Sequence, residues 1–300
     1  MSVLKKVRTT VFNKKKLVGA LSRRGFFDLL SDKQFIKLQF KTIFGYSLDL
    51  NNPKTFNEKL QWIKLKDRKP IYSTMVDKAE VKDYVAEKIG EQYIIKTLGI
   101  WDKFEDIDFD LLPERFVMKC THDSGGLVIC KEKTTLDFEK TQRKIEKCIK
   151  TNYYKQGREW PYKNVKPRII AEEYMEDTEV GELRDYKFFC FNGKVKCFKI
   201  DFDRFIEHRA NYFSKNKELL PFGEVVCPPD YNRKLDMPEN LDEMIELAEK
   251  LAEKIPFVRI DFYSCNHKIY FGEMTFFPAS GFGKFIPNKW DRELGDWISL

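Results

Sequence analysis

The chain has 300 residues, of which 42% are hydrophobic and 34% are charged, and its net charge is +7. This length is too great for one small core and sufficient for two or three lobes. The composition therefore indicates a globular protein, and no apolar run approaches the length needed to span a bilayer.

The cysteines and histidines give no sign of a zinc site. The seven cysteines are scattered singly without a CxxC pair, and no histidine lies at metal-ligand spacing from a cysteine or from another histidine. With no recognisable signal peptide, this pattern predicts reduced, mostly buried thiols and a cytoplasmic location. The cysteines are Cys120, Cys130, Cys148, Cys190, Cys197, Cys227 and Cys265.

Residues 1–74 are predicted to form a helical N-terminal region that begins with a basic segment. Apolar residues recur at helical spacings between Phe26 and Ile43. The basic segment could contact anionic lipid at the inner membrane face or an acidic polymer, or it could be a frayed terminus. No nucleic-acid-binding motif accompanies it, so we expect no nucleic-acid partner. The basic residues are Lys5, Lys6, Arg8, Lys14, Lys15, Lys16, Arg23 and Arg24.

Two helices are predicted next along the chain. Thr55 and Glu58 have the spacing of a capping box, which indicates the start of the first helix. The second helix is predicted over residues 75–90, with Gly90 as its C-cap. Lys78 would lie in the first turn of this helix, where the helix dipole disfavours a cation. Lys78 is therefore a candidate functional residue.

A glycine-rich loop joins two predicted strands, residues 115–120 and 127–130. Its two glycines permit close approach and leave backbone N–H groups free to point at one anion. A lysine at the end of the first strand could add positive charge to the same phosphates. The loop does not have the Walker pattern, and an ordinary hairpin turn is the alternative. The candidate phosphate-binding residues are Lys119, Ser124, Gly125 and Gly126.

The middle of the chain contains a predicted helix over residues 134–153 and then a strand over Arg168–Met175. The strand passes into an acidic stretch, and it would leave one lobe and enter another. Such a segment is a natural hinge, and its backbone N–H and C=O groups can bind the edge of a planar base. The hinge residues are Glu172, Glu173, Tyr174 and Met175.

Two further strands are predicted over residues 185–191 and 194–202. Asn192 and Gly193 join them, which is the strongest short-range signal for a hairpin. Asp185 and Lys187 are two residues apart, so they lie on one face of the first strand. Both could point into the cleft between the lobes.

The last third of the chain contains a predicted helix over residues 241–254 and a hairpin of strands 257–263 and 268–275. Alternation places four polar residues of this hairpin on comparable faces, and its carboxylates have apolar neighbours. Carboxylates on adjacent strands are typical ligands of Mg²⁺ in nucleotide-using enzymes. The alternative is a structural ion pair between the arginine and the carboxylates. The four residues are Arg259, Asp261, Glu273 and Thr275.

The order of these features resembles the ATP-grasp architecture. The segments TFNEKLQW, DKAEVKDYV, FVMKCTHDSGG, IIAEEYM, DYKFFCFNGKV, RIDFY and YFGEMTFFPASG are similar to the ATP-grasp family named for teichuronopeptide synthesis, the TupA-like family. The resemblance covers roughly Asn52 to Phe285 and implies an α+β fold with two lobes that clamp ATP. It predicts a helical region over 1–74, a nucleotide-clamping small lobe over 75–170 and a C-terminal lobe with the metal site over 171–300.

The resemblance also implies a role for each candidate residue. Lys78, Lys119, Ser124, Gly125 and Gly126 would contact the phosphates, and Glu172, Glu173, Tyr174 and Met175 would lie beside adenine, with a nearby acid reaching the ribose. Asp185 would lie beside the nucleotide, and Lys187, Arg259 and Ser280 would act at the reacting groups. The backbone around Ser280 would form a cradle for the substrate carboxylate; the alternative is a simple turn. Asp261 and Glu273 would hold Mg²⁺. Where many relatives have Asn, this chain has Thr275, a weaker ligand, so one or two Mg²⁺ ions are expected.

The implied reaction is ATP-dependent joining of a carboxylate to an amine through an acyl phosphate. By analogy with the family, the substrates would be an amino acid or peptide and a uronic acid of a bacterial capsular or surface polysaccharide. Three alternatives are a kinase on the same fold, a sugar-nucleotide glycosyltransferase and a polysaccharide-binding protein with exposed aromatic residues. The glycosyltransferase would use the DxD-like letters Asp201-Phe202-Asp203.

Overall fold

The structure is a computed structural model that describes residues 17–22, 24–123, 125–177, 183–203 and 207–300. Ser124, a predicted phosphate-binding residue, and the basic residues before residue 17 lie outside the described residues. Within the described ranges, no helix is long and apolar enough to cross a membrane.

After the helical residues 17–22, two capped helices follow, α2 (Asp32–Phe44) and α3 (Phe56–Lys66). The side chain of Thr55 accepts a hydrogen bond from the Glu58 N–H, and Glu58 accepts one from the Thr55 N–H, at 3.0 Å. The predicted capping box is thereby confirmed. It satisfies backbone donors that the helix itself leaves without partners.

The helix expected over residues 75–90 is divided into α4 (Ile71–Val76) and α5 (Val81–Ile89). At the break, the Asp77 carboxylate accepts a hydrogen bond from the Ala79 N–H at 2.8 Å. A short acidic side chain that bonds to its own backbone competes with helix continuation. Lys78 therefore lies in the connection between two helices rather than in the first turn of one.

The smaller lobe contains a four-stranded antiparallel sheet with the order β1-β4-β2-β3. The expected glycine-loop hairpin is confirmed as β2 and β3, and α6 packs on the sheet with Ile145 against its apolar face. The strands are β1 (Thr97–Trp101), β2 (Phe116–Cys120), β3 (Val128–Cys130) and β4 (Ile169–Glu173), and α6 spans Phe138–Ile149.

The larger lobe contains a five-stranded antiparallel sheet with the order β10-β9-β5-β6-β7. Asn192 and Gly193 both have positive φ at the turn between β5 and β6, as the Asn-Gly hairpin signal predicts. The strands are β5 (Arg184–Phe191), β6 (Lys194–Phe202), β7 (Arg209–Ser214), β9 (Phe257–Cys265) and β10 (Lys268–Thr275), and α8 spans Leu241–Leu251.

Short elements complete the chain. They are the α-helices α7 (Tyr154–Gly157) and α9 (Trp290–Asp296), the strands β8 (Gly223–Glu224) and β11 (Phe285–Ile286), and the 3₁₀ helices Glu91–Tyr93, Phe104–Asp106, Phe109–Leu111, Lys133–Thr135, Trp160–Tyr162 and Pro278–Gly281. Strands β8 and β11 pair with each other beside the larger sheet.

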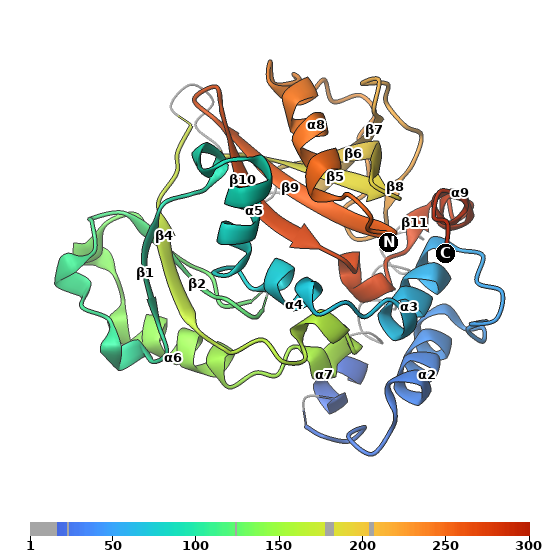
Figure 1. Ribbon diagram of the computed structural model, residues 1–300, viewed down its shortest axis with the longest axis horizontal. Helices are drawn as coiled ribbons and strands as arrows, with labels where there is room; N and C mark the ends of the chain where they lie inside the picture. Colours follow the sequence, from blue (N-terminus) through green and yellow to red (C-terminus); the bar gives the residue numbers. More distant parts are fainter. Residues whose placement is uncertain (1–16, 23, 124, 178–182, 204–206) are drawn as a thin grey trace.

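Each lobe has its own hydrophobic core. Figure 1 shows the smaller sheet with α6 at the left, the larger sheet with α8 at the upper right, and α2 and α3 at the lower right. Helices α4 and α5 lie between the two sheets in this view, and their buried residues, Val81 and Val85 among them, belong to the core of the larger lobe. The segment around Lys78 therefore faces the smaller lobe from a base in the larger one.

Candidate active site

The carboxylates of the hairpin β9–β10 are brought together by backbone pairing. Asp261 lies opposite Glu273, and Arg259 lies opposite Thr275. The register shifts between Phe271 and Glu273, a bulge of the kind that redirects side chains near functional sites. The predicted hairpin and the shared face of its polar residues are confirmed.

Arg259 bridges the two carboxylates. Its Nε lies 2.6 Å from Asp261 Oδ1, and its Nη2 lies 2.8 Å from Glu273 Oε1. Thr275 Oγ1 donates to the same Glu273 oxygen at 3.2 Å. The ion pair that the sequence offered as an alternative is thus present, and it holds both carboxylates at one point of the sheet.

A chain of charged side chains continues from this point across the sheet. Lys187 Nζ contacts Asp185 and lies 3.4 Å from both Asp261 Oδ2 and Asp201 Oδ2. Farther along, Lys199 Nζ lies 3.6 Å from Asp201 Oδ1 and 3.2 Å from a Glu224 oxygen. The predicted residues Asp185 and Lys187 therefore belong to the same cluster as Asp261.

The pKa values of the two hairpin carboxylates shift in opposite directions. Burial raises the pKa of Asp261 to about 6, although Arg259 and Lys187 oppose this shift. For Glu273, burial acts in the same direction, but Arg259 and Lys78 outweigh it and the pKa is lowered. Glu273 is also the more open of the two, with 43% of its side chain exposed.

The charge balance of this ion-paired cluster suits a divalent cation. Five carboxylates and three Lys or Arg side chains are joined by ion pairs among the described residues, an excess of two negative charges. Oxygen donors are the ligands that Mg²⁺ prefers, and it is bound by one or two carboxylates together with waters and phosphate oxygens. Asp261 and Glu273 therefore fit Mg²⁺ in both charge and donor type.

A basic pocket forms where β2 and β4 of the smaller lobe meet α5. Glu172 of β4 is buried and contacts Lys119 of β2, and its Oε1 lies 2.7 Å from Lys82 Nζ of α5. Burial would raise the pKa of Glu172, but the two lysines outweigh it and hold that pKa below its usual range. Two cations around one carboxylate leave positive charge for an anionic ligand.

Lys78 and the glycine loop lie next to the basic pocket. Lys78 Nζ donates to the Asp123 carbonyl oxygen, and burial lowers its pKa. Within the loop, the Gly126 N–H donates to Asp123 Oδ1 at 3.3 Å, while Gly125 is exposed. The N–H of Gly126 is thus engaged by its own loop.

Two narrow cavities lie at the acidic and basic parts of the site. One is lined by Lys78 and Glu273, and the other by Lys78, Lys119 and Glu172, and each holds about 10 Å³. That volume is about the minimum that can hold one water molecule. Binding of a nucleotide here requires the lobes or the lysine side chains to move apart.

The other predicted residues lie around these two parts. Glu173 is exposed, and the Tyr174 ring lies 4.8 Å from the Arg115 guanidinium, while Met175 follows in the segment between the lobes. Ser280 has a left-handed backbone with φ of 59°, and its carbonyl oxygen accepts a hydrogen bond from Lys64 Nζ at 2.9 Å. No recorded contact between described residues joins Ser280 to Asp261 or Glu273, so its role as a substrate cradle stays a prediction.

Lys199 and Glu224 of the acidic cluster were missed in the sequence, as were Lys82 and Asp123. Lys82 is four residues after Lys78, a spacing that places side chains on one face of a helix and could have indicated it. Asp123 organises the glycine loop through its carbonyl and its carboxylate. A short acidic residue ahead of two glycines is a common turn signal, so the sequence alone does not distinguish this role.

Comparison with known families supports the resemblance. The model of a family described as TupA-like ATP-grasp matches residues 58–299, and it confirms the superfamily and the ATP-grasp fold that the motifs predicted. A search of curated proteins gave no match.

Among solved structures, the chain is similar to D-alanine–D-alanine ligase from Bacillus anthracis. For the form complexed with ATP, identity is 15% and the TM-score 0.45, with 99% of this chain and 92% of that one covered. For another structure of that ligase, the TM-score is 0.39, with 67% and 57% covered at 15% identity. The ATP-grasp ligase PsnB, in complex with a precursor variant, Mg and ADP, gives 10% identity and a TM-score of 0.40, with 73% and 57% covered. The chain thus spans a little over half of the length of two of these three structures.

Proposed function

Because the chain belongs to the TupA-like family of ATP-grasp enzymes, we propose that it is an ATP-dependent carboxylate–amine ligase. One substrate carboxylate is activated as an acyl phosphate, an amine displaces the phosphate, and the products are an amide, ADP and phosphate. The observation that carries the proposal is the placement of Asp261 opposite Glu273, with Arg259 between them, together with Lys78, which lines one cavity with Glu273 and another with Lys119 and Glu172.

The residues of the two lobes have complementary tasks in this proposal. Asp261 and Glu273 hold Mg²⁺, and Lys78 and Lys119 bind phosphate oxygens, while bound MgATP supplies the phosphoryl group. Arg259 stabilises negative charge on the transferring group once it no longer pairs with both carboxylates. Positioning and charge neutralisation dominate such catalysis, so the protein needs no nucleophile of its own.

We further propose that the substrates are an amino acid or peptide and a uronic acid of a bacterial surface polysaccharide. A polysaccharide substrate of this kind is acidic, and the net charge of +7 favours association with it. The reaction would take place on the cytoplasmic side, with the basic N-terminal residues near a lipid-linked precursor.

The first test of the nucleotide site is the melting temperature of the protein, measured with MgATP, with a magnesium UDP-sugar and without either ligand. MgATP at about a hundred times its dissociation constant adds roughly 2.7 kcal/mol to the free energy of unfolding. We expect MgATP alone to raise the midpoint and Glu273→Gln to reduce the response. Stabilisation only by the UDP-sugar would replace the proposal with a glycosyltransferase.

Ligase and kinase activities are separated by their products. With a uronic acid and a set of amino acids, a ligase releases phosphate only when the amine is present, and hydroxylamine traps the acyl phosphate as a hydroxamate. A stable phosphorylated sugar that forms without an amine would identify a kinase instead.

A further inference from the structure

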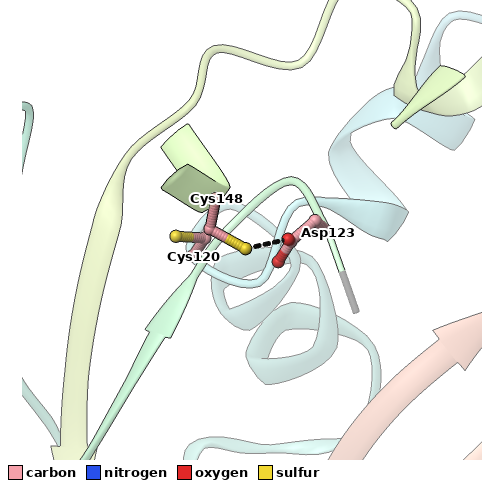
Figure 2. Close-up of side chains that lie close together, drawn as sticks. All are labelled: Cys120, Asp123 and Cys148. Carbon is pink, nitrogen blue, oxygen red and sulfur yellow. Dashed lines mark hydrogen bonds between the residues drawn. The ribbon is translucent and has the colours of Figure 1, made fainter. Parts of the chain in front are cut away.

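A cluster of two cysteines and an aspartate lies behind the glycine loop (Figure 2). Cys120 ends β2, Asp123 belongs to the loop, and Cys148 lies near the end of α6. Their two sulfur atoms and one carboxylate oxygen all lie within 4.8 Å of one another. Cys120 and Asp123 are buried, and Cys148 is half-buried.

Because Gly126 has no side chain, the side chains of the two cysteines and the aspartate have room to approach one another. A Cβ at this position would lie 2.8 Å from the sulfur atoms of both Cys120 and Cys148. The same glycine donates its N–H to Asp123 Oδ1, while Asp123 Oδ2 accepts the Cys148 thiol. The loop thus fixes the orientation of the carboxylate and leaves its second oxygen directed at the sulfurs.

His122 anchors the end of α6 to the loop. Its Nε2 lies 3.2 Å from the carbonyl oxygen of Cys148 and 3.1 Å from that of Thr151. Cys120 Sγ lies 3.8 Å from the Ile145 carbonyl oxygen one turn earlier. The two sulfurs are therefore held close together by contacts that do not involve the sulfur of Cys148.

We propose that Cys120, Asp123 and Cys148 bind a thiophilic divalent metal ion of the Zn²⁺ class, with water as the fourth ligand. Zinc takes thiolate ligands at about 2.3 Å and carboxylate oxygens at about 2.0–2.2 Å in tetrahedral geometry. Ligand atoms in such a site lie within 4.8 Å of one another, as they do here. Both thiols release their protons to solvent as the metal binds. Sulfur ligands exclude Mg²⁺ from this position, so the site is chemically distinct from the Asp261–Glu273 pair.

A second cluster of possible ligands is less suited to a metal ion. Asp201, His208 and Cys227 also have ligand atoms within 4.8 Å of one another. Lys199 Nζ, however, lies 3.6 Å from Asp201 Oδ1 and 4.0 Å from Cys227 Sγ. A lysine cation therefore contacts two of the three possible ligands there, whereas Lys78 bonds to the backbone carbonyl oxygen of Asp123 and not to its carboxylate.

The metal ion would connect the glycine loop to β2 and to α6. Gly126 and the carbonyl group that accepts from Lys78 belong to this loop, so the metal would order the segment that faces the nucleotide. The expected consequence is slower hydrogen exchange at the Gly125 and Gly126 amides when the metal is bound.

Cobalt is the probe that tests the site. The full chain without a histidine tag is stripped with a chelator, kept reduced with a phosphine and titrated with Co²⁺ in the absence of nucleotide. We expect a near-ultraviolet thiolate-to-cobalt charge-transfer band and the visible bands of tetrahedral Co²⁺, both removed by Zn²⁺. Absence of these bands in the reduced protein would overturn the proposal, even if Cys120 and Cys148 can be oxidised to a disulfide.

Variants test whether these three residues bind the Co²⁺ that produces the absorption bands. Cys148→Ala should weaken Co²⁺ binding by more than the roughly 10–100-fold that loss of an outer partner of a metal site costs, and Asp123→Asn should weaken it while preserving the shape of the side chain. Cys130→Ala is the matched control, because Cys130 is buried in the same lobe but lies outside the cluster. Circular dichroism verifies that each variant is folded. Bands that persist in folded Cys148→Ala would refute the assignment of the metal site. The proposed function is tested independently by a separate measurement of MgATP binding.

Discussion

The acidic and basic parts of the cleft are assembled in different ways. Asp261 and Glu273 lie on neighbouring strands of one hairpin, where a backbone ladder fixes their register. The basic pocket instead requires Lys82 from a helix and Lys119 and Glu172 from two strands of another lobe. The first arrangement is local in sequence, and the second depends on tertiary structure and on a single central carboxylate.

The two parts also carry opposite excess charge. The ion-paired cluster around Arg259 and Lys187 has more carboxylates than cations, whereas Glu172 is shared by two lysines. A ligand that presents a divalent cation to one part and phosphates to the other neutralises both. This complementarity explains why the cavities between the two parts hold only about 10 Å³ each, since lysines and carboxylates of facing parts attract each other.

The largest effect is expected on the acidic part. Asp261→Asn removes a proposed metal ligand while keeping its shape, and we expect amide formation to slow about a thousandfold, or about 4 kcal/mol in activation free energy. The measurement is ADP release with saturating MgATP. Asp242→Asn is the control, because its side chain is 75% exposed on α8. Equal rates for Asp261→Asn and the control would show that Asp261 is not a metal ligand.

The next effect tests the dependence of the basic pocket on one carboxylate. Glu172→Ala leaves two lysines without their buried partner, and we expect a loss of about 3 kcal/mol in the free energy of unfolding. Urea denaturation measures it. Glu173→Ala, the exposed neighbour on the same strand, should stay within about 0.5 kcal/mol of the wild type. A small effect at Glu172 would mean that the pocket is held by other contacts.

The comparison also explains what could be predicted from the sequence. The Thr55–Glu58 capping box, the Asn192-Gly193 turn and the pairing of β9 with β10 follow from local rules, and the structure confirms all three. The metal-site candidates belong to this group because they share one hairpin.

Features that depend on distant partners could not be predicted in this way. Lys82 can be identified as a site residue only from its ion pair with Glu172, which is far away in the sequence. The break between α4 and α5 results from the Asp77 side chain, whose carboxylate bonds to the Ala79 and Glu80 amides and contacts Arg168. The meeting of Cys120 with Cys148 requires α6 to pack on the small sheet, so single-cysteine spacing gave no sign of it.

The two lysines of the basic pocket should differ in what their loss affects. Lys82 also donates to the Ile95 carbonyl oxygen at 2.7 Å and to Thr97 Oγ1 at 2.9 Å, whereas Glu172 is the ion-pair partner recorded for Lys119 among the described residues. We expect Lys119→Met to weaken MgATP binding about tenfold, or about 1.4 kcal/mol.

Lys82→Met should lower mainly the free energy of unfolding. Calorimetric titration and urea denaturation separate the two effects, with Lys88→Met on the exposed face of α5 as the control. If Lys82→Met instead weakened MgATP binding and Lys119→Met lowered the free energy of unfolding, the roles proposed for the two lysines would be wrong.

The pH dependence should also differ between the two parts. The pKa of Asp261 is raised to about 6, so its protonation below that pH should weaken Mg²⁺ binding by up to about tenfold per pH unit. Without metal, Asp261 should lower the free energy of unfolding as pH rises from its unfolded pKa, about 3.9, to about 6, because the folded state binds more protons there.

Glu172 should show the opposite slope. Its pKa is lowered in the fold, so its contribution is present above the unfolded pKa and lost as pH falls through the folded pKa. Urea denaturation of the wild type, Asp261→Asn and Glu172→Gln across the acidic range measures both slopes. Parallel curves for the wild type and both variants would contradict this assignment.

The smallest effect is expected at Thr275, which donates to a Glu273 oxygen at 3.2 Å. Thr275→Val keeps the shape and removes the hydroxyl group, so we expect kcat/KM to fall about fivefold, close to the roughly 1 kcal/mol of one hydrogen bond. Thr275→Ser should retain most of the activity. If the hydroxyl group binds a second Mg²⁺ directly, the loss in Thr275→Val will shrink as the Mg²⁺ concentration is raised. A loss that does not depend on Mg²⁺ would assign Thr275 only the orientation of Glu273.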